Sequence, residues 1–363
     1  MYINKIKLQN FRNYDEQEID LNKNINIFYG NNAQGKTNIL EAIFLVSFGK
    51  SFRTNKDKEM IKFDKDFSKV YVDFQKKNID GKINVMISEK KIFLVNDIKI
   101  KKLSELLGNI NVVIFTPDDM NILKEGPAKR RRFLDMMISQ VRPNYVHILN
   151  NYLKTLEQRN NYLKQNTFDS TMIETWDEKL VEYGSQIFKY RNDFIEKIKS
   201  KIKYIHKEIA DEEISIKYIS DCSNKEQLKN KLKNNLKIDK IRGYTSSGCH
   251  RDDFKVFIND KEVNIYGSQG QSRTSILSLK LAELQVIYDE IGEYPILLLD
   301  DFMSELDETR INNFLKNVKD IQVIITCTKK IDIANCKYFK VEKGTIKEYW
   351  AWQNQKLFIN YVC

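Results

Sequence analysis

The chain has 363 residues, of which 42% are hydrophobic and 11% aromatic, which excludes a disordered chain and allows about two domains. No apolar run approaches the length of a membrane-spanning helix, so no membrane partner is expected. The formal net charge of +10 favours a polyanionic partner such as nucleic acid only weakly. Lys and Asn are abundant throughout, and a base-composition bias would produce the same excess.

The first residues predict a strand and a cytoplasmic protein. Residues 1–6 alternate apolar and polar side chains and lack the apolar core of a signal peptide, so the chain is expected to stay in the cytosol. The five cysteines form no C-x-x-C pair, and free thiols are expected there. The three histidines are too scattered to suggest a metal cluster.

A phosphate-binding loop is the strongest signal in the sequence. An apolar stretch at 25–29 predicts a strand and residues 38–44 predict a helix, so a chance glycine-rich turn is a poor alternative. The loop between them fits G-x-x-x-x-G-K-[ST] and consists of Gly30, Asn31, Asn32, Ala33, Gln34, Gly35, Lys36 and Thr37. Its backbone N–H groups can cradle phosphate oxygens. Lys36 can reach the β and γ phosphates, and the Thr37 hydroxyl can bind Mg²⁺.

The rest of residues 1–117 predicts a mixed β region around the helix that follows this loop. Alternating apolar residues at 70–74 and 83–87 flank Asp80-Gly81, which predicts a hairpin with its turn at that dipeptide. A second hairpin is predicted with its turn at Asn96-Asp97.

Residues 118–237 predict an inserted helical lobe, because they are long, charged and helical in spacing, with few Gly or Pro. The densest basic cluster lies there, at the start of a predicted helix, and consists of Lys129, Arg130, Arg131 and Arg132. Guanidinium groups suit phosphate contacts, so this cluster is a candidate DNA contact. The alternative, that it pairs with carboxylates of the lobe such as Asp135, weighs about equally.

Arg53 and Lys56, which follow the helix of the phosphate loop, are two further candidate DNA contacts. For them too, the alternative is pairing with carboxylates of the protein itself. The sequence contains no motif that reads base edges in a groove. It therefore favours binding to the phosphate backbone without sequence specificity.

A second anion-binding loop precedes a predicted helix at 275–284. This loop consists of Ser268, Gln269, Gly270 and Gln271. Exposed N–H groups, a serine hydroxyl and the positive end of a helix dipole favour an anion there. Because the first loop already covers one side of a bound nucleotide, the simplest use is to close on the nucleotide of a partner subunit. An ordinary N-capped helix is the alternative.

A buried strand predicted at 296–299 ends in two carboxylates, Asp300 and Asp301. In P-loop nucleotidases a carboxylate at such a position holds Mg²⁺, which assigns Asp300 to the metal. Asp301 would then orient or deprotonate the attacking water; a strand that simply ends in a polar turn is the alternative. A second buried strand is predicted at 321–328, with polar residues at its tip placed to sense the γ phosphate.

In this order, the motifs resemble ATPase heads of the SMC-like branch of ABC proteins, and within it the RecF family of bacterial recombination mediators. The resemblance runs to about Tyr349 and is carried by residues 10–14, 50–54, 117–118, 126–135, 268–271 and 299–307. It implies an α/β fold: an ABC-ATPase-like P-loop head with an antiparallel β region and an inserted helical lobe.

The domains expected from this resemblance are four. Residues 1–117 would form the first part of ATPase lobe I, and 118–237 the helical lobe II. Residues 238–348 would complete the ATPase lobe with the signature loop, the Walker B carboxylates and the D-loop. Residues 349–363 would be a C-terminal tail.

The resemblance also implies roles for individual residues. Arg12 would touch the nucleotide, 30–37 would bind ATP, and 268–271 would act as the signature loop across a dimer. Asp307 would belong to the loop that links the two sites. Lys36, Asp300 and Asp301 would be catalytic, with Mg²⁺ bound by Thr37 and Asp300.

Three positions depart from the family pattern. Cys327 stands where ABC proteins often have histidine, which fits slow hydrolysis. Glu125 and Cys249 stand where Gly and Pro are expected, and both substitutions change what the local backbone can adopt.

The activity implied is a weak DNA-dependent ATPase that uses ATP as a conformational switch. An ATP-dependent homodimer would clamp DNA near single-strand gaps. It would help RecR and RecO place RecA in repair, replication restart and the SOS response. Two alternatives are a transport-type ABC subunit, which the helical insertion and basic charge disfavour, and a small-molecule kinase, which leaves the signature loop and Asp307 without a role.

Overall fold

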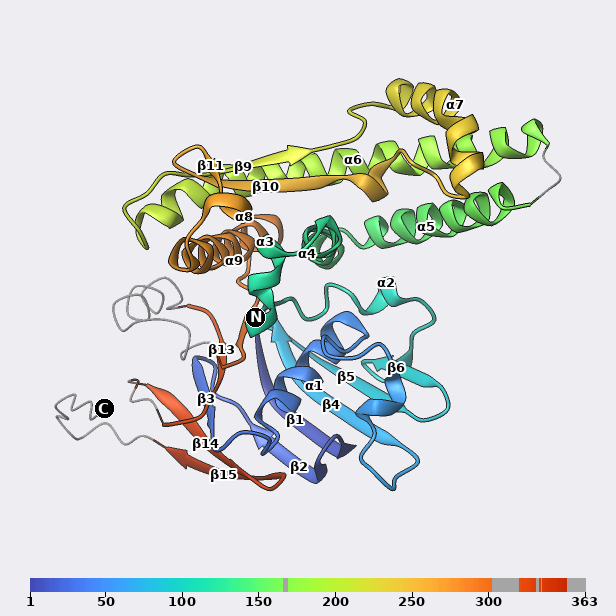
Figure 1. The fold of residues 1–363 in the computed structure, drawn as a ribbon. Coiled ribbons are helices and arrows are strands. Elements are labelled where there is room, and N and C mark those ends of the chain that lie inside the picture. The colour runs from blue at the N-terminus through green and yellow to red at the C-terminus, as the bar shows by residue number, and fades with distance from the viewer. Residues whose placement is uncertain (166–168, 302–319, 331–332, 334, 351–363) are drawn as a thin grey trace. The chain divides into compact units, whose positions relative to one another are not determined.

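The computed structural model describes residues 1–165, 169–301, 320–330, 333 and 335–350. The chain forms two compact units, the first made of residues 1–117 and 294–363 and the second of residues 118–293 (Figure 1). Asp307 and the tail beyond Trp350 lie outside the described residues, so their predicted roles remain predictions. Each unit has its own sheets and core.

The first unit contains a six-stranded sheet in the order β15-β14-β3-β13-β12-β8. Its strands are β3 (Ile25–Tyr29), β8 (Val112–Phe115), β12 (Ile296–Leu299), β13 (Val323–Cys327), β14 (Cys336–Glu342) and β15 (Thr345–Trp350). All neighbouring pairs are parallel except β14 and β15. Strands β8, β12 and β13 are buried throughout, as expected for runs of apolar residues in a parallel sheet. Their carboxyl ends therefore meet at one edge.

A second sheet of the first unit is antiparallel, in the order β2-β1-β4-β5-β6-β7. Its strands are β1 (Tyr2–Phe11), β2 (Tyr14–Asp20), β4 (Ser68–Lys76), β5 (Ile79–Ile87), β6 (Lys91–Val95) and β7 (Ile98–Lys99). The two predicted hairpins are present as β4–β5 and β6–β7, and the second turns at Asn96-Asp97 as predicted. The fold class expected from the sequence is thereby confirmed.

The position of the first hairpin turn was predicted wrongly. The chain turns at Lys77 and Asn78, which adopt φ of 48° and 61°, while Asp80 and Gly81 lie inside β5. Two consecutive left-handed residues give the tight turn that matches the twist of antiparallel strands. Gly81 is needed for another reason: a Cβ there would lie 2.4 Å from Cζ of Phe74 on β4.

Helix α1 (Lys36–Phe48) connects the phosphate loop to the core of the first unit. It begins after Gly35 and ends at Gly49, both left-handed, and nearly all of its side chains are buried. The 3₁₀ turn η1 (Asp57–Met60) and the short helix α2 (Leu103–Leu106) complete this unit's helical elements among the described residues.

The second unit is mainly helical. Its elements are η2 (Pro117–Met120), α3 (Asn121–Lys124), α4 (Pro127–Val141), α5 (Pro143–Leu163), α6 (Ser170–Lys207), β9 (Ile214–Ile219), α7 (Lys225–Arg242), η3 (Cys249–Arg251), β10 (Asp253–Ile258), β11 (Lys261–Glu262), α8 (Val263–Tyr266) and α9 (Gln269–Ile291). Strands β9 and β10 run along α6 in a three-stranded sheet with the order β11-β10-β9 (Figure 1). No helix in the described parts of the chain has a stretch long and apolar enough to cross a membrane.

The helical lobe was expected to end at residue 237, whereas the second unit continues to Glu293. The cause is the long helix α9, which packs along α6 and not within the first unit. The buried His206 Nδ1 lies 2.8 Å from Ser278 Oγ and ties these two helices together. Strand β10 also belongs to the second unit, although residues 238–348 were expected to complete the ATPase lobe.

Candidate nucleotide site

The phosphate loop connects β3 to α1 through two glycines that no other residue replaces easily. Gly30 has φ 154° and Gly35 has φ 114°, a range that side chains rarely adopt. A Cβ on Gly30 would lie 2.3 Å from the Val341 carbonyl oxygen. A Cβ on Gly35 would lie 2.5 Å from the Asn13 side-chain amide. The loop therefore keeps its N–H groups free of side-chain crowding.

Asn13 and Gln34 hold the loop in place. The Asn13 amide donates to the Gln34 carbonyl oxygen at 2.7 Å and accepts from the Asn38 amide at 2.8 Å. The Gln34 side chain accepts from the Lys343 backbone N–H at 2.6 Å. These bonds connect the loop to the turn after β1 and to the β14–β15 hairpin, so its shape is set before a ligand binds.

Lys36 is positioned to meet phosphate oxygens. Its Nζ donates to the carbonyl oxygens of Gly30 and Asn31, at 2.6 and 2.8 Å, and its side chain is largely buried. Burial lowers the pKa of Lys36, while the nearby carboxylates of Asp301 and Asp300 oppose that shift.

Thr37 and Asp300, the two predicted magnesium ligands, lie side by side in the structure. The Thr37 hydroxyl donates to Asp300 Oδ1 at 2.8 Å. Mg²⁺ binds oxygens at about 2.0–2.1 Å in an octahedron, which places neighbouring ligands about 2.9 Å apart. The two oxygens therefore fit adjacent positions around one ion, and two protein ligands are typical for Mg²⁺ bound with a nucleotide.

The tip of β13 supports the carboxylates at the end of β12. The Thr326 hydroxyl donates to Asp300 Oδ1 at 2.7 Å, and the Asp301 backbone N–H donates to the same hydroxyl at 3.0 Å. Asp301 has φ 47° and influences the titration of Lys36. Cys327 is buried beside them, and burial raises the pKa of its thiol to about 12, so it stays protonated at neutral pH.

Arg12 is committed to a carboxylate on α1. Its guanidinium donates to both oxygens of Glu41, at 2.8 and 2.5 Å, and to the Glu59 carbonyl oxygen at 2.6 Å. Glu41 is fully buried and also accepts from the Ser51 hydroxyl at 2.5 Å. Sequence analysis did not single out Glu41, although an acidic residue within the apolar run 39–46 is a signal for a buried ion pair.

Arg53 belongs to the same cluster. Its guanidinium donates to the Asn38 side chain at 2.7 Å and lies 3.5 Å from Glu41 Oε2. Lys56 is mostly exposed and lies 3.5 Å from Glu59. Of the two candidate DNA contacts near α1, Lys56 therefore has the more accessible charge.

The signature loop lies in the second unit, at the start of α9. Ser268 accepts the Gln271 backbone N–H at 3.1 Å, and the Gln271 side chain accepts the Ser268 N–H at 2.9 Å, which forms a capping box. The Gln271 side-chain amide also donates to Glu212 at 2.7 Å. Ser268 and Gln269 are exposed, so the loop is open to a ligand outside this unit.

In the basic cluster at the start of α4, some side chains bind other groups of the lobe and others are exposed to solvent. Arg130 is buried and binds both oxygens of Asp253, at 2.5 and 3.0 Å. Arg131 donates to the Asp252 carbonyl oxygen at 2.8 Å, and burial lowers its pKa. Lys129 lies 3.6 Å from Glu125, and Arg132 is exposed. The partner proposed as the alternative, Asp135, binds Arg191 instead.

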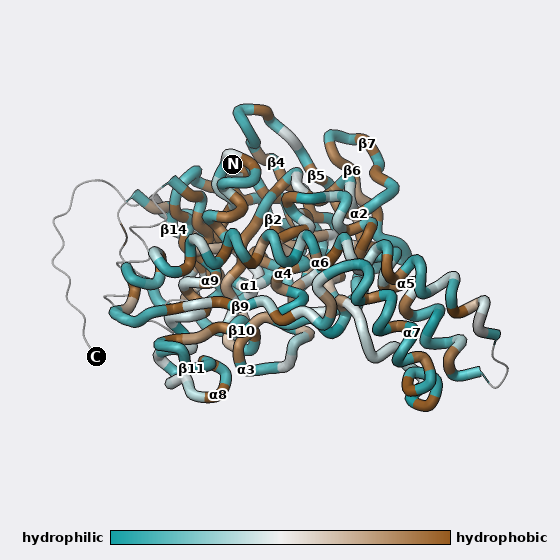
Figure 2. Tube along the Cα trace, turned by 90° about the horizontal axis from the view of Figure 1, so that it is seen from above, coloured by the Kyte–Doolittle hydropathy of each residue, from teal (hydrophilic) through white to brown (hydrophobic). Residues whose placement is uncertain are grey.

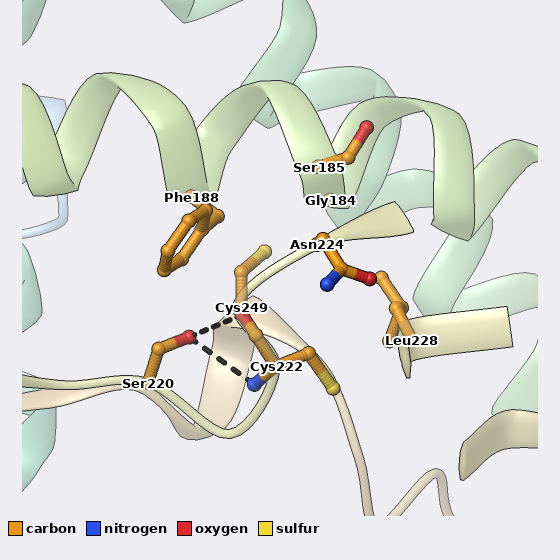
Figure 3. Close-up of a pocket in the computed structure, with 8 residues that line it drawn as sticks. All are labelled: Gly184, Ser185, Phe188, Ser220, Cys222, Asn224, Leu228 and Cys249. Atoms are coloured by element: carbon orange, nitrogen blue, oxygen red, sulfur yellow. Dashed lines mark hydrogen bonds between the residues drawn. The ribbon is translucent and has the colours of Figure 1, made fainter. Parts of the chain in front are cut away.

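The departures from the family pattern at Glu125 and Cys249 are accommodated locally. Glu125 has φ −85°, so no glycine is required, and its carbonyl oxygen accepts from Arg130 at 2.8 Å. Cys249 begins the turn η3, and its carbonyl oxygen accepts from Arg191 at 2.6 Å. The Cys249 and Cys222 side chains line the same small cavity under α6 (Figure 3).

Comparisons with known proteins agree with this geometry. Residues 2–346 match the family described as RecF/RecN/SMC N terminal domain. A DNA replication and repair protein RecF from Clostridium perfringens (strain SM101) is 44% identical over 360 residues, covering 96% of this chain and 100% of the relative. A RecF from Clostridium botulinum (strain ATCC 19397) is 47% identical over 362 residues, with the same coverage.

Solved structures give the same result. A structure described as the recombination mediator protein RecF with ATP in the RecFOR pathway aligns with a TM-score of 0.91 and 40% identity, covering 96% of this chain and 98% of that one. An SMC head bound to the C-terminal winged helix of ScpA aligns with a TM-score of 0.57 at 15% identity. The second match concerns the fold alone.

Proposed function

Because this chain belongs to the RecF family, within the family of RecF, RecN and SMC N-terminal domains, we propose that it is an ATP-dependent, DNA-binding recombination mediator. ATP and Mg²⁺ are its cofactors, and ATP hydrolysis is slow. The chain acts in the cytoplasm with RecO and RecR, through which RecA is loaded near single-strand gaps in repair, replication restart and the SOS response.

The convergence of Lys36, Thr37 and Asp300 carries this proposal. Asp300 lies 263 residues after Thr37 in the sequence, yet Thr37 Oγ1 and Asp300 Oδ1 lie 2.8 Å apart at the carboxyl edge of the parallel sheet. A buried ammonium and a pair of oxygens at magnesium spacing form a receptor for a nucleotide triphosphate.

The signature loop supplies the other half of the site from a second copy. The Ser268 hydroxyl accepts a hydrogen bond within its own loop and still has its proton to donate. A γ phosphate at the N-terminus of α9 would accept that proton and face the positive end of the helix dipole. Two copies would thus share two nucleotides and close into a clamp.

Hydrolysis would open the clamp by removing the γ phosphate. Mg²⁺, when bound by Thr37 and Asp300, would neutralise phosphate charge. Asp301 would orient or deprotonate the attacking water. Cys327, whose thiol stays protonated, would supply no anion or base there, which accounts for slow turnover. Arg12 would reach the nucleotide only by loosening its bonds to Glu41.

DNA contacts of this clamp would come from accessible cations. Among the expected contacts, Lys56, Lys129 and Arg132 present charge to solvent, and Arg53 is half exposed. Arg130 is excluded, because it is buried and its guanidinium binds both oxygens of Asp253.

Binding of a fluorescent gapped duplex, measured by anisotropy at moderate salt with and without ATP, tests the proposal. ATP-dependent binding is expected. Equal and strongly salt-sensitive binding in both conditions would contradict the clamp, since a basic surface acting alone gives that behaviour.

A further inference from the structure

Helix α7 (Lys225–Arg242) in the second unit carries an unusual line of positive charge. Lys225, Lys229, Lys233 and Lys237 follow one another at four-residue spacing, so they lie along one ridge of the helix. All four are exposed, whereas Leu228, Leu232 and Asp239 face the lobe. Figure 2 shows α7 as mostly hydrophilic. We refer to these four lysines as the α7 stripe.

The α7 stripe has no carboxylate partner within the parts of the chain that the structure describes. Asp239 is buried and bound to Arg159 at 2.8 Å, and Asp221 lies 2.8 Å from Lys231, outside the stripe. Glu226 is the other acidic residue of the helix and is exposed near its start. Asp239 and Asp221, two carboxylates on or near the helix, are therefore bound to other side chains.

This arrangement costs the isolated protein stability. Like charges four residues apart on a helix repel each other. Lys225 and Lys229 also lie near the N-terminus of α7, where the helix dipole disfavours cations. An external anion would relieve both effects.

We propose that the α7 stripe binds the phosphate backbone of duplex DNA and is a contact surface separate from the basic cluster of α4. The stripe extends about 18 Å, from Lys225 to Lys237. Each DNA strand has a phosphate about every 3.4 Å along the axis, so a segment of duplex as long as the stripe holds about five phosphates per strand. Because each strand winds around the axis, the stripe contacts only the phosphates that face it. A straight row of single charges, without groups that read base edges, suits this regular polyanion.

This inference rests on DNA binding in the proposed function and adds the site to it. The test compares the full-length chain with the triple variant K229Q/K233Q/K237Q. The matched control is K99Q/K101Q/K102Q, which removes the same charge from exposed lysines of the first unit. A third variant, K229R/K233R/K237R, keeps the charge on α7.

The measurement is the affinity for a fluorescent duplex in the presence of ATP over a series of salt concentrations. The stripe variant is expected to bind duplex about tenfold or more weakly than the parent. Its plot of log K against log salt should also be less steep, by about 3 in slope, since each lost phosphate contact contributes about 0.9. The control and the arginine variant should keep the parent slope. The stripe variant should melt at the parent temperature or slightly above it, because repulsion has been removed.

Two results would overturn the inference, and they differ. If the parent chain binds duplex and the stripe variant matches the control in affinity and slope, the α7 stripe is a solvated surface and the proposed function stands. If the parent chain itself binds no duplex, the proposed function fails together with this inference.

Discussion

Helices α1 and α9 both begin at a glycine-containing loop, but their first turns are completed in different ways. Gly35 precedes α1 without any side-chain cap, so the first N–H groups are left for a ligand. Ser268 and Gln271 cap α9 with a reciprocal pair of hydrogen bonds. The first turn of α1 is therefore open to an anion such as the phosphates of the proposed nucleotide, whereas the first turn of α9 is stable alone. In the proposed function, the Ser268 hydroxyl proton of α9 is donated to the nucleotide of a partner.

Removing the lysine ammonium at the start of α1, which is expected to contact the phosphates, should have the largest effect on ATP binding. Lys36→Ala deletes the ammonium that faces the phosphates, so ATP binding and ATP-dependent dimers should both be lost. Equilibrium binding of a fluorescent ATP analogue and sedimentation velocity measure the two effects. Dimers that persist with ATP in this variant would contradict the role of Lys36.

Blocking the α9 loop should separate dimer formation from ATP binding. Ser268→Arg places a bulky cation at the expected contact with the partner's nucleotide, so dimers should be lost while the monomer still binds ATP. Ser268→Thr is the matched control, because it keeps both the hydroxyl and the cap. Loss of ATP binding by the arginine variant alone would show that Ser268 serves its own subunit.

The same substitution in the two loops should have opposite effects on stability. Gly35→Ala forces a side chain into φ 114° and against Asn13, so it should lower the free energy of unfolding by about 1–3 kcal/mol. Gly270 lies in the first turn of α9, and a Cβ there would have its nearest contact, Ser268 Oγ, at 3.8 Å. Gly270→Ala should therefore raise the free energy of unfolding by up to about 1 kcal/mol. Denaturant unfolding measures the free energy of unfolding of both variants. Equal changes in the two variants would contradict the difference drawn between the two loops.

Both helices also bury a glutamate, and the two glutamates have different partners. Glu41 is bound by Arg12, whereas Glu283 on α9 lies 3.5 Å from Lys280, and burial raises the pKa of Glu283 from 4.5 to about 7. The folded chain therefore holds a proton that the unfolded chain releases above pH 4.5. The contribution of protonated Glu283 to the free energy of unfolding is complete below pH 4.5 and is lost as the pH rises through about 7.

Melting curves of the parent chain and Glu283→Gln between pH 4.5 and 7.5 isolate this small effect. The parent should lose stability relative to the variant as the pH rises. Lys280 also lies 3.3 Å from Asp119, a carboxylate that the substitution leaves in place. A constant difference across this range would mean that Glu283 does not titrate there.

The sequence predicted those features that depend on local chemistry. The phosphate loop, the buried strand before Asp300 and the Asn96-Asp97 turn follow from residue types at fixed spacing, and the structure contains them. The division of the chain was harder to predict, because α9 is apolar on most faces and its packing on α6 depends on residues far away. The burial of Arg130 depends likewise on Asp253, 123 residues later.

The central claim is that each nucleotide site is completed by the second copy of the chain. A mixture of the Lys36→Ala and Ser268→Arg variants tests this claim. One variant carries a donor fluorophore and the other carries an acceptor. In the mixture, the intact phosphate loop of one variant can meet the intact Ser268 loop of the other. The account predicts ATP-dependent energy transfer only in the mixture; no transfer there, or ATP-dependent dimers of either variant alone, would contradict it.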